Sequence, residues 1–153
     1  MEFAPVLSTV AKTIQTAIAP VFLLAGIGAI LNVMVGRLAR IVDRARDLEK
    51  LHPASIGPEH ERHVFELRLL DRRIHVINTA VFLVVLAAVA NCCVVAMLFT
   101  AELLDLRLGK AVAIAFILSM VLLIGGLMWF LVEVRMSVRA IRVRAELLER
   151  TRQ

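Results

Sequence analysis

Two histidines, His60 and His63, are the residues of this sequence that most resemble a pair of metal ligands. A helical zinc-protease motif needs two histidines four positions apart, so that both imidazoles face one ion. Here they are three positions apart, so the motif is not matched. With Glu59 or His52 they could still bind a metal, but a solvated, charged helix start is the simpler interpretation. We therefore expect no metal, no cofactor and no catalytic residue.

A second group of residues with chemical potential consists of charges that flank long uncharged runs. The group comprises Arg37, Arg40, Arg44, Arg72, Arg73, Glu133, Arg135 and Arg139. Guanidinium groups at headgroup depth attract anionic lipid. Around an axis of several subunits, the same arginines would form a ring that favours anions. Glu133 adjoins an apolar run, where an unpaired carboxylate is costly, so we expect it to pair with Arg37 or Arg73.

The elements that must position these charges are three runs without charged residues, at about residues 17–36, 76–101 and 111–132. Each is long enough to cross the hydrocarbon core of a bilayer as a helix. The hydrophobic content of 60% is too high for an ordinary soluble domain. The sequence thus predicts an all-α membrane protein with three transmembrane helices, with Pro20 in the opening turn of the first.

The basic residues indicate the orientation of these spans. Most of the 18 Lys and Arg lie in residues 37–75 and 133–153. Because cytoplasmic loops carry an excess of Lys and Arg, we expect a cytoplasmic hairpin, a cytoplasmic C-terminal tail and an N-terminus outside. The basicity is thus a topology signal. No groove-reading motif accompanies it, so we do not expect nucleic acid as a partner.

Apolar residues at alternating spacings of three and four continue past each span, which is typical of helices that pack along a seam. The three series are Leu31, Met34, Leu38, Ile41, Ala45 and Leu48; Leu67, Leu70, Ile74, Ile77, Val81 and Val84; and Leu127, Leu131, Val134, Val138, Ile141, Ala145 and Leu148. We expect a coiled-coil-like cytoplasmic stalk. Residues 17–153 would then form one domain, preceded by an amphipathic interfacial segment at residues 1–16.

Small and polar residues recur every four positions along the first span: Leu24, Gly28, Asn32 and Gly36. Such a row lets another helix approach closely, and it could instead line a water-filled path in an oligomer. In the second span we expect Asn91 to make an interhelical hydrogen bond or to belong to a permeation path. No other metal-ligating residue stands at a suitable spacing from Cys92 and Cys93, and we interpret them as small core residues.

Several segments together resemble a family of small bacterial three-span membrane proteins of unknown function. They are Ile18-Ala-Pro-Val21, Gly28, the run Arg37-Leu-Ala-Arg-Ile-Val-Asp-Arg-Ala-Arg46, Leu67-Arg-Leu-Leu-Asp-Arg-Arg-Ile74 and Glu133-Val-Arg135. The resemblance covers about residues 18–144, and the arginine-rich run is its most specific part. It implies the three-span fold and a bacterial inner membrane, and it implies no reaction, ligand or catalytic residue.

Two functions are compatible with these features. The first is a homo-oligomeric pore or transport path lined by the first helix, with a cationic inner ring. The alternative is a non-conducting scaffold or assembly factor whose basic stalk recruits anionic lipid or a cytoplasmic partner. An enzyme is not expected, because the chain has neither a Gly-rich phosphate loop nor a GxSxG motif.

Overall fold

The computed structural model of the protein describes the backbone of residues 3–51 and 57–149. Side chains are described for residues 11–50, 57, 60–61 and 63–138. The prediction for His52 and the expected turn at residues 52–56 fall outside these ranges, as do the side chains of Glu59 and Arg139 and the end of the third apolar series.

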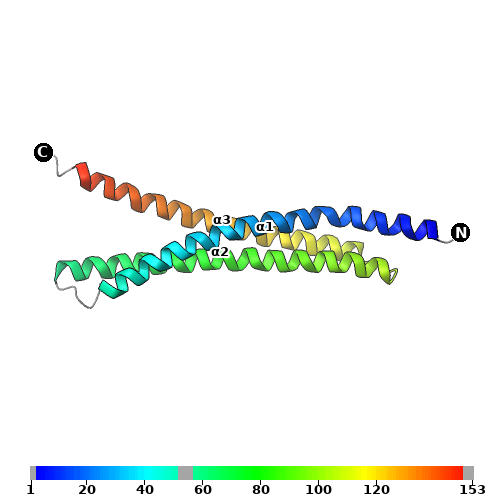
Figure 1. Ribbon diagram of the computed structural model, residues 1–153, viewed down its shortest axis with the longest axis horizontal. Coiled ribbons are helices and arrows are strands. Elements are labelled where there is room, and N and C mark those ends of the chain that lie inside the picture. The colour runs from blue at the N-terminus through cyan, green and yellow to red at the C-terminus, as the bar shows by residue number, and fades with distance from the viewer. Residues whose placement is uncertain (1–2, 52–56, 150–153) are drawn as a thin grey trace. The chain divides into compact units, whose positions relative to one another are not determined.

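The described chain consists of three long helices: α1 (Phe3–Leu51), α2 (Pro58–Leu103) and α3 (Gly109–Glu149) (Figure 1). Each contains a stretch long and apolar enough to cross a membrane, with mean hydropathies of 2.3, 2.8 and 2.6 in sequence order. The predicted helical class and the number of span-capable helices are thus confirmed. At about 1.5 Å per residue, α2 with its 46 residues is roughly 70 Å long, more than twice the thickness of a hydrocarbon core.

Helix α1 runs without a break through the position where we expected the first span to begin. Pro20 therefore lies inside the helix, and its expected place in an opening turn is wrong. A proline inside a transmembrane helix is tolerated where neighbouring groups satisfy the freed backbone atoms. The carbonyl that Pro20 leaves without a backbone donor is that of Thr16, four positions earlier. The buried Asn91 side chain of α2 donates instead from Nδ2 to the carbonyl oxygen of Pro20 itself at 2.7 Å, so this bond joins α2 to α1 at the proline. The expected interhelical bond of Asn91 is thus confirmed.

The chain divides into two compact units, and each contains a part of all three helices. Unit 1 comprises Met1–Asn32 and Leu83–Gly125. Its core is made of small and medium-sized apolar side chains: Ala17, Ile27, Val84, Ala87, Val94 and Leu123. The segment between α2 and α3 belongs to this unit, and there Asp105 adopts a positive φ of 50°.

Unit 2 comprises Val33–Phe82 and Gly126–Gln153. One cluster of its core is formed by Ile41, Leu48, Leu70 and Ile77, with Leu38, Ala45, Leu67, Ile74 and Phe130 packed against it. Except for Phe130, these residues belong to the first two predicted apolar series. The sequence therefore identified the inward faces of α1 and α2 in this unit correctly. A supercoiled stalk stays a prediction.

The prediction that the third apolar series marks the inward face of α3 is wrong. Leu127, Leu131 and Val138 are 36%, 43% and 59% exposed, whereas Glu133 is fully buried. Since hydrocarbon is as apolar as a leucine side chain, a transmembrane helix gains little by turning leucines inward, but a carboxylate must find partners. The polar residue therefore decides which face of α3 points inward.

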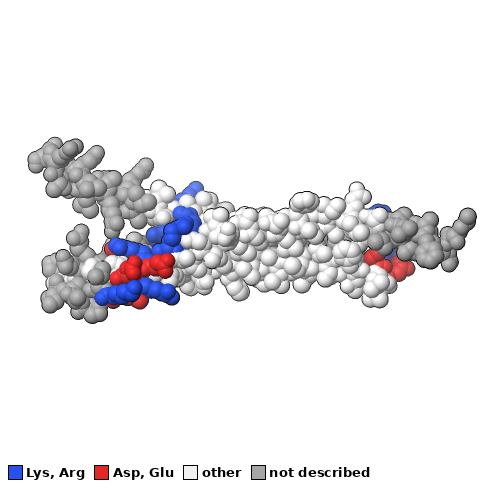
Figure 2. All heavy atoms as spheres, viewed as in Figure 1, with Lys and Arg blue, Asp and Glu red and all other residues white. Residues whose placement is uncertain are grey.

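Much of the apolar surface is uncovered. In the most apolar 18-residue window of each helix, only 17%, 22% and 17% of the residues are buried. In Figure 2 the described charges of unit 2 lie close together, while the apolar helix segments form a white surface. Cys92 and Cys93 are part of this exposed surface, so their interpretation as core residues is wrong. A thiol is apolar enough to face hydrocarbon.

Candidate functional site

The site in unit 2 is built around one buried carboxylate. The Glu133 side chain, on α3, is fully buried. Arg73 of α2 donates from Nη2 to Glu133 Oε1 at 2.9 Å, and Arg37 of α1 places its Nη1 3.3 Å from Glu133 Oε2. The Oε2 contact is an ion pair without hydrogen-bond geometry. The expectation that Glu133 pairs with Arg37 or Arg73 is confirmed, and both arginines take part.

Two further contacts fix these arginines. Arg73 Nη2 also donates to the Ser137 hydroxyl at 2.9 Å, and the Arg37 guanidinium lies 5.6 Å from the centre of the Phe130 ring. A cation over an aromatic face is attracted by the ring quadrupole. Phe130, Glu133 and Ser137 are three and four positions apart, so they share one face of α3. Arg37 and Arg73 are thereby held in place.

Beside this carboxylate lies a pocket of about 270 Å³ in unit 2, lined by Arg37, Arg40, Ile41, Arg44, Leu70, Arg73 and Ser137. We call it the arginine pocket. Arg44 donates from Nε and Nη2 to Glu66 Oε1 at 3.2 and 3.0 Å. Arg40 pairs with no carboxylate of the described residues. Among the described residues, the four guanidinium groups of the pocket thus pair with two carboxylates, which leaves an excess of two positive charges.

Two described arginines of the predicted charge group are not part of this pocket. Arg72 and Arg135 are exposed and do not line it. The described part of the predicted group is therefore divided: Arg37, Arg40, Arg44, Arg73 and Glu133 come together, and Arg72 and Arg135 lie outside the pocket.

The small and polar row of α1 is only partly covered by other parts of the described chain. Gly28 and Asn32 are exposed, and Leu24 and Gly36 are half-buried. A Cβ atom added at Gly28 or Gly36 would meet nothing within 4 Å. Asn32 makes no hydrogen bond within the described residues. The row is therefore an open surface of this chain, and its role in helix packing or in a path stays a prediction.

The histidine segment brings no metal site together within the part of the chain that is described. Among those residues, no three His, Cys, Asp or Glu side chains lie close enough to hold an ion. His60 and His63 are half-buried, and the Nδ1 atom of His63 has no hydrogen-bond partner among the described residues.

Sequence reasoning missed three residues of the site: Ser137, Phe130 and Glu66. The sequence positions of Ser137 and Phe130 could have indicated this. Ser137 lies four positions after Glu133 and Phe130 three positions before it, so both share its face of the helix. Glu66 lies on a different helix from Arg44, and no local spacing links the two. It could be found only from the packing of α1 against α2.

Comparison with known proteins adds one match. The family model described as "Protein of unknown function (DUF2721)" matches residues 17–143. No curated protein and no solved structure matches the chain. The matched segment contains every described residue of the arginine pocket and of the row on α1.

Proposed function

The chain belongs to the DUF2721 family, whose function is unknown, and we propose that it is a multi-pass membrane protein that holds the phosphate groups of anionic phospholipid in its arginine pocket. The observation that supports this proposal is the charge of the pocket. Glu133 neutralises part of Arg37 and Arg73, and Glu66 pairs with Arg44, but Arg40 lines the same pocket and pairs with no carboxylate of the described residues. A guanidinium group is well suited to bind phosphate oxygens.

The place of the pocket along the helices supports a lipid headgroup as ligand. Arg37 directly follows the uncharged run of α1, Arg73 closely precedes that of α2, and Glu133 directly follows that of α3. All three thus stand at the end of an apolar segment, at the depth where headgroups lie. Each Lys or Arg near an anionic membrane surface contributes about 1 kcal/mol to the attraction.

The orientation of this proposal follows from the distribution of charge. The positive-inside rule places the arginine pocket on the cytoplasmic side, with the N-terminus outside and the helix ends of unit 2 extending inward as a stalk. In a bacterium, the membrane that borders the cytoplasm is the inner membrane, and we place the protein there. The protein would then act as a non-conducting scaffold that gathers anionic lipid beside its spans.

The test is lipid retention by the full-length protein. The protein is reconstituted in nanodiscs with phosphatidylglycerol and phosphatidylcholine in equal amounts, extracted in a neutral detergent, and its retained lipid is quantified by mass spectrometry. Arg40→Gln should lower the retained phosphatidylglycerol about five-fold, because one favourable contact of about 1 kcal/mol is lost. Arg72→Gln is the matched control, since this exposed arginine lies outside the pocket. Equal retention by wild type and Arg40→Gln would refute the proposal.

A second candidate function is a homo-oligomeric path lined by α1, and the open row on this helix favours it. An exposed asparagine without a partner in an apolar run gains a hydrogen bond when a second copy covers it. Arg37 would then contribute to an inner ring, although Glu133 already neutralises part of its charge.

Mass and conductance test this candidate. Light scattering in detergent gives the subunit number, and a monomeric mass excludes the path because three helices cannot enclose one. If the protein is oligomeric, Asn32→Leu and Arg37→Ala should alter currents across a lipid bilayer. Unaltered currents would speak against the assignment of these residues to a path.

A further inference from the structure

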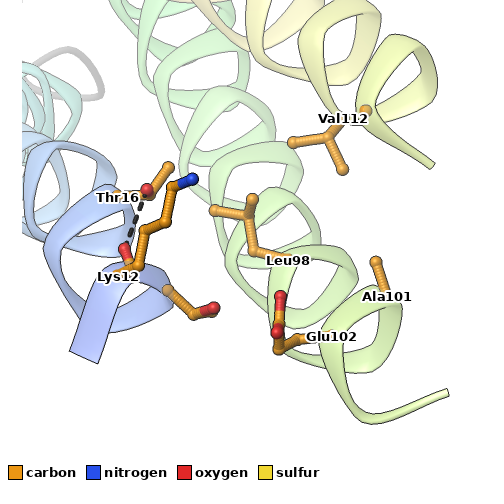
Figure 3. Close-up of a pocket in the computed structure, with 8 residues that line it drawn as sticks. Lys12, Thr16, Leu98, Ala101, Glu102 and Val112 are labelled. Atoms are coloured by element: carbon orange, nitrogen blue, oxygen red, sulfur yellow. Dashed lines mark hydrogen bonds between the residues drawn. The ribbon is translucent and has the colours of Figure 1, made fainter. Parts of the chain in front are cut away.

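A second cavity, in unit 1, has a different charge pattern from the arginine pocket. It has a volume of about 560 Å³ and is lined by Lys12, Thr13, Thr16, Leu98, Ala101, Glu102, Gly109 and Val112 (Figure 3). All three helices contribute to its wall. The volume lies in the range of small-ligand sites in proteins.

Two opposite charges line this cavity without pairing. Figure 3 shows Lys12 extending from α1 toward α2, and Glu102 extending from α2 into the same space. Within the described part of the chain, neither side chain lies within 4.0 Å of an opposite charge. Both charges are exposed, so water solvates them when the cavity holds no ligand. A ligand with one charge only would be attracted by one of these groups and repelled by the other.

The rest of the wall limits what can bind. Leu98, Ala101 and Val112 provide an apolar side. The Thr16 hydroxyl donates to the Lys12 carbonyl oxygen at 3.0 Å, so its proton is already used and its oxygen remains an acceptor. Among the described residues of the wall, Lys12 is thus the only charged donor and Glu102 the only anionic acceptor.

We propose that this cavity binds a small zwitterionic group in which an ammonium and an oxyanion are separated by a few bonds. The oxyanion accepts from Lys12 Nζ, and the ammonium donates to the Glu102 carboxylate. The group could belong to a free solute such as an amino acid or to a lipid headgroup such as ethanolamine phosphate, which share this chemistry. The site uses no residue of the arginine pocket, so it is independent of the function proposed above.

Binding is measured on the full-length protein in neutral detergent by titration calorimetry with O-phosphoethanolamine. Lys12→Gln and Glu102→Gln should each weaken binding at least ten-fold, because each removes one charge-assisted hydrogen bond. Lys110→Gln and Asp105→Asn are matched controls, as these charged residues lie in the same region but do not line the cavity. Phosphocholine should bind more weakly, since its quaternary ammonium cannot donate a hydrogen bond.

A second measurement identifies the source of the ligand. A further variant shows whether a loss of binding is due to misfolding. Nanodiscs that contain phosphatidylethanolamine and phosphatidylcholine are used to measure retained lipid as above. Binding of O-phosphoethanolamine without selective retention of phosphatidylethanolamine indicates a free solute, and selective retention of phosphatidylethanolamine indicates a headgroup; both support the proposal. The charge-exchanged double variant Lys12→Glu with Glu102→Lys should recover binding that the single variants lose.

Three results would overturn the proposal. The first is that neither O-phosphoethanolamine binds nor phosphatidylethanolamine is retained selectively. The second is that glycerol phosphate, which lacks the ammonium, binds as tightly as O-phosphoethanolamine. The third is that the Lys12 and Glu102 variants bind as well as the two controls while their melting temperatures equal that of the wild type.

Discussion

Replacing Glu133 by glutamine removes the only carboxylate that contacts both Arg37 and Arg73 in the described chain. The glutamine is almost the same size and keeps an oxygen that accepts from Arg73. The change therefore removes the charge and little else. Arg73, whose side chain is 15% exposed, is then left without a carboxylate partner among the described residues.

The expected loss of stability follows from the burial of these groups. At an effective dielectric constant of about 20, two unit charges about 4 Å apart attract each other by roughly 4 kcal/mol. Part of this attraction offsets the cost of removing the charges from water. Breaking a buried pair by removing one partner costs about 3–5 kcal/mol in proteins. Because glutamine keeps one hydrogen bond, we expect a loss of about 3 kcal/mol.

Thermal unfolding in detergent measures this loss, with Trp129 as the reporter. Trp129 is the only tryptophan and lies one helical turn before Glu133. A loss of about 3 kcal/mol corresponds to a melting temperature lower by roughly 10 °C for a chain of this length. The matched control is Glu66→Gln, which removes the exposed pair with Arg44 and should cost at most about 1 kcal/mol. If both variants melt at the same temperature, the central role of Glu133 is refuted.

Further predictions concern the two units separately. Asn91→Leu should destabilise unit 1 by about 0.5–1.5 kcal/mol because the bond to the Pro20 carbonyl is lost, whereas Asn32→Leu, at an exposed site, should leave the melting temperature of the monomer unchanged. Ile77→Ala should cost about 2–4 kcal/mol in chemical unfolding, since Ile77 is fully buried in the core of unit 2. Asp105→Val should lower the melting temperature relative to Asp105→Gly, because a β-branched residue is strained at a φ of 50°; equal temperatures would contradict this reasoning.

The sequence predicted the number of span-capable helices and the inward faces of α1 and α2. Both depend on local features, the lengths of uncharged runs and the spacing of apolar residues. Along α2, for example, Leu70 and Ile77 are seven positions apart, and both are buried in the core of unit 2. The pairing of Glu133 was equally predictable, because a carboxylate beside an apolar run requires a cation.

Other features could not be derived from local spacing. The spacing of Leu127, Leu131 and Val138 gave the wrong inward face for α3, because leucine packs as well against lipid as against protein. The pairing of Arg44 with Glu66 depends on how α1 and α2 lie side by side in unit 2. The same holds for the pocket that Arg40 faces.

The sequence by itself thus determined the helices, their apolar segments and the need of Glu133 for a counterion. Only the tertiary structure decided that two arginines from two helices share this one carboxylate, that Ser137 joins them, and that Lys12 and Glu102 line one cavity. The physical reason is that hydropathy and helical period are properties of a single helix, whereas the partner of a charge is chosen by whichever helices pack around it.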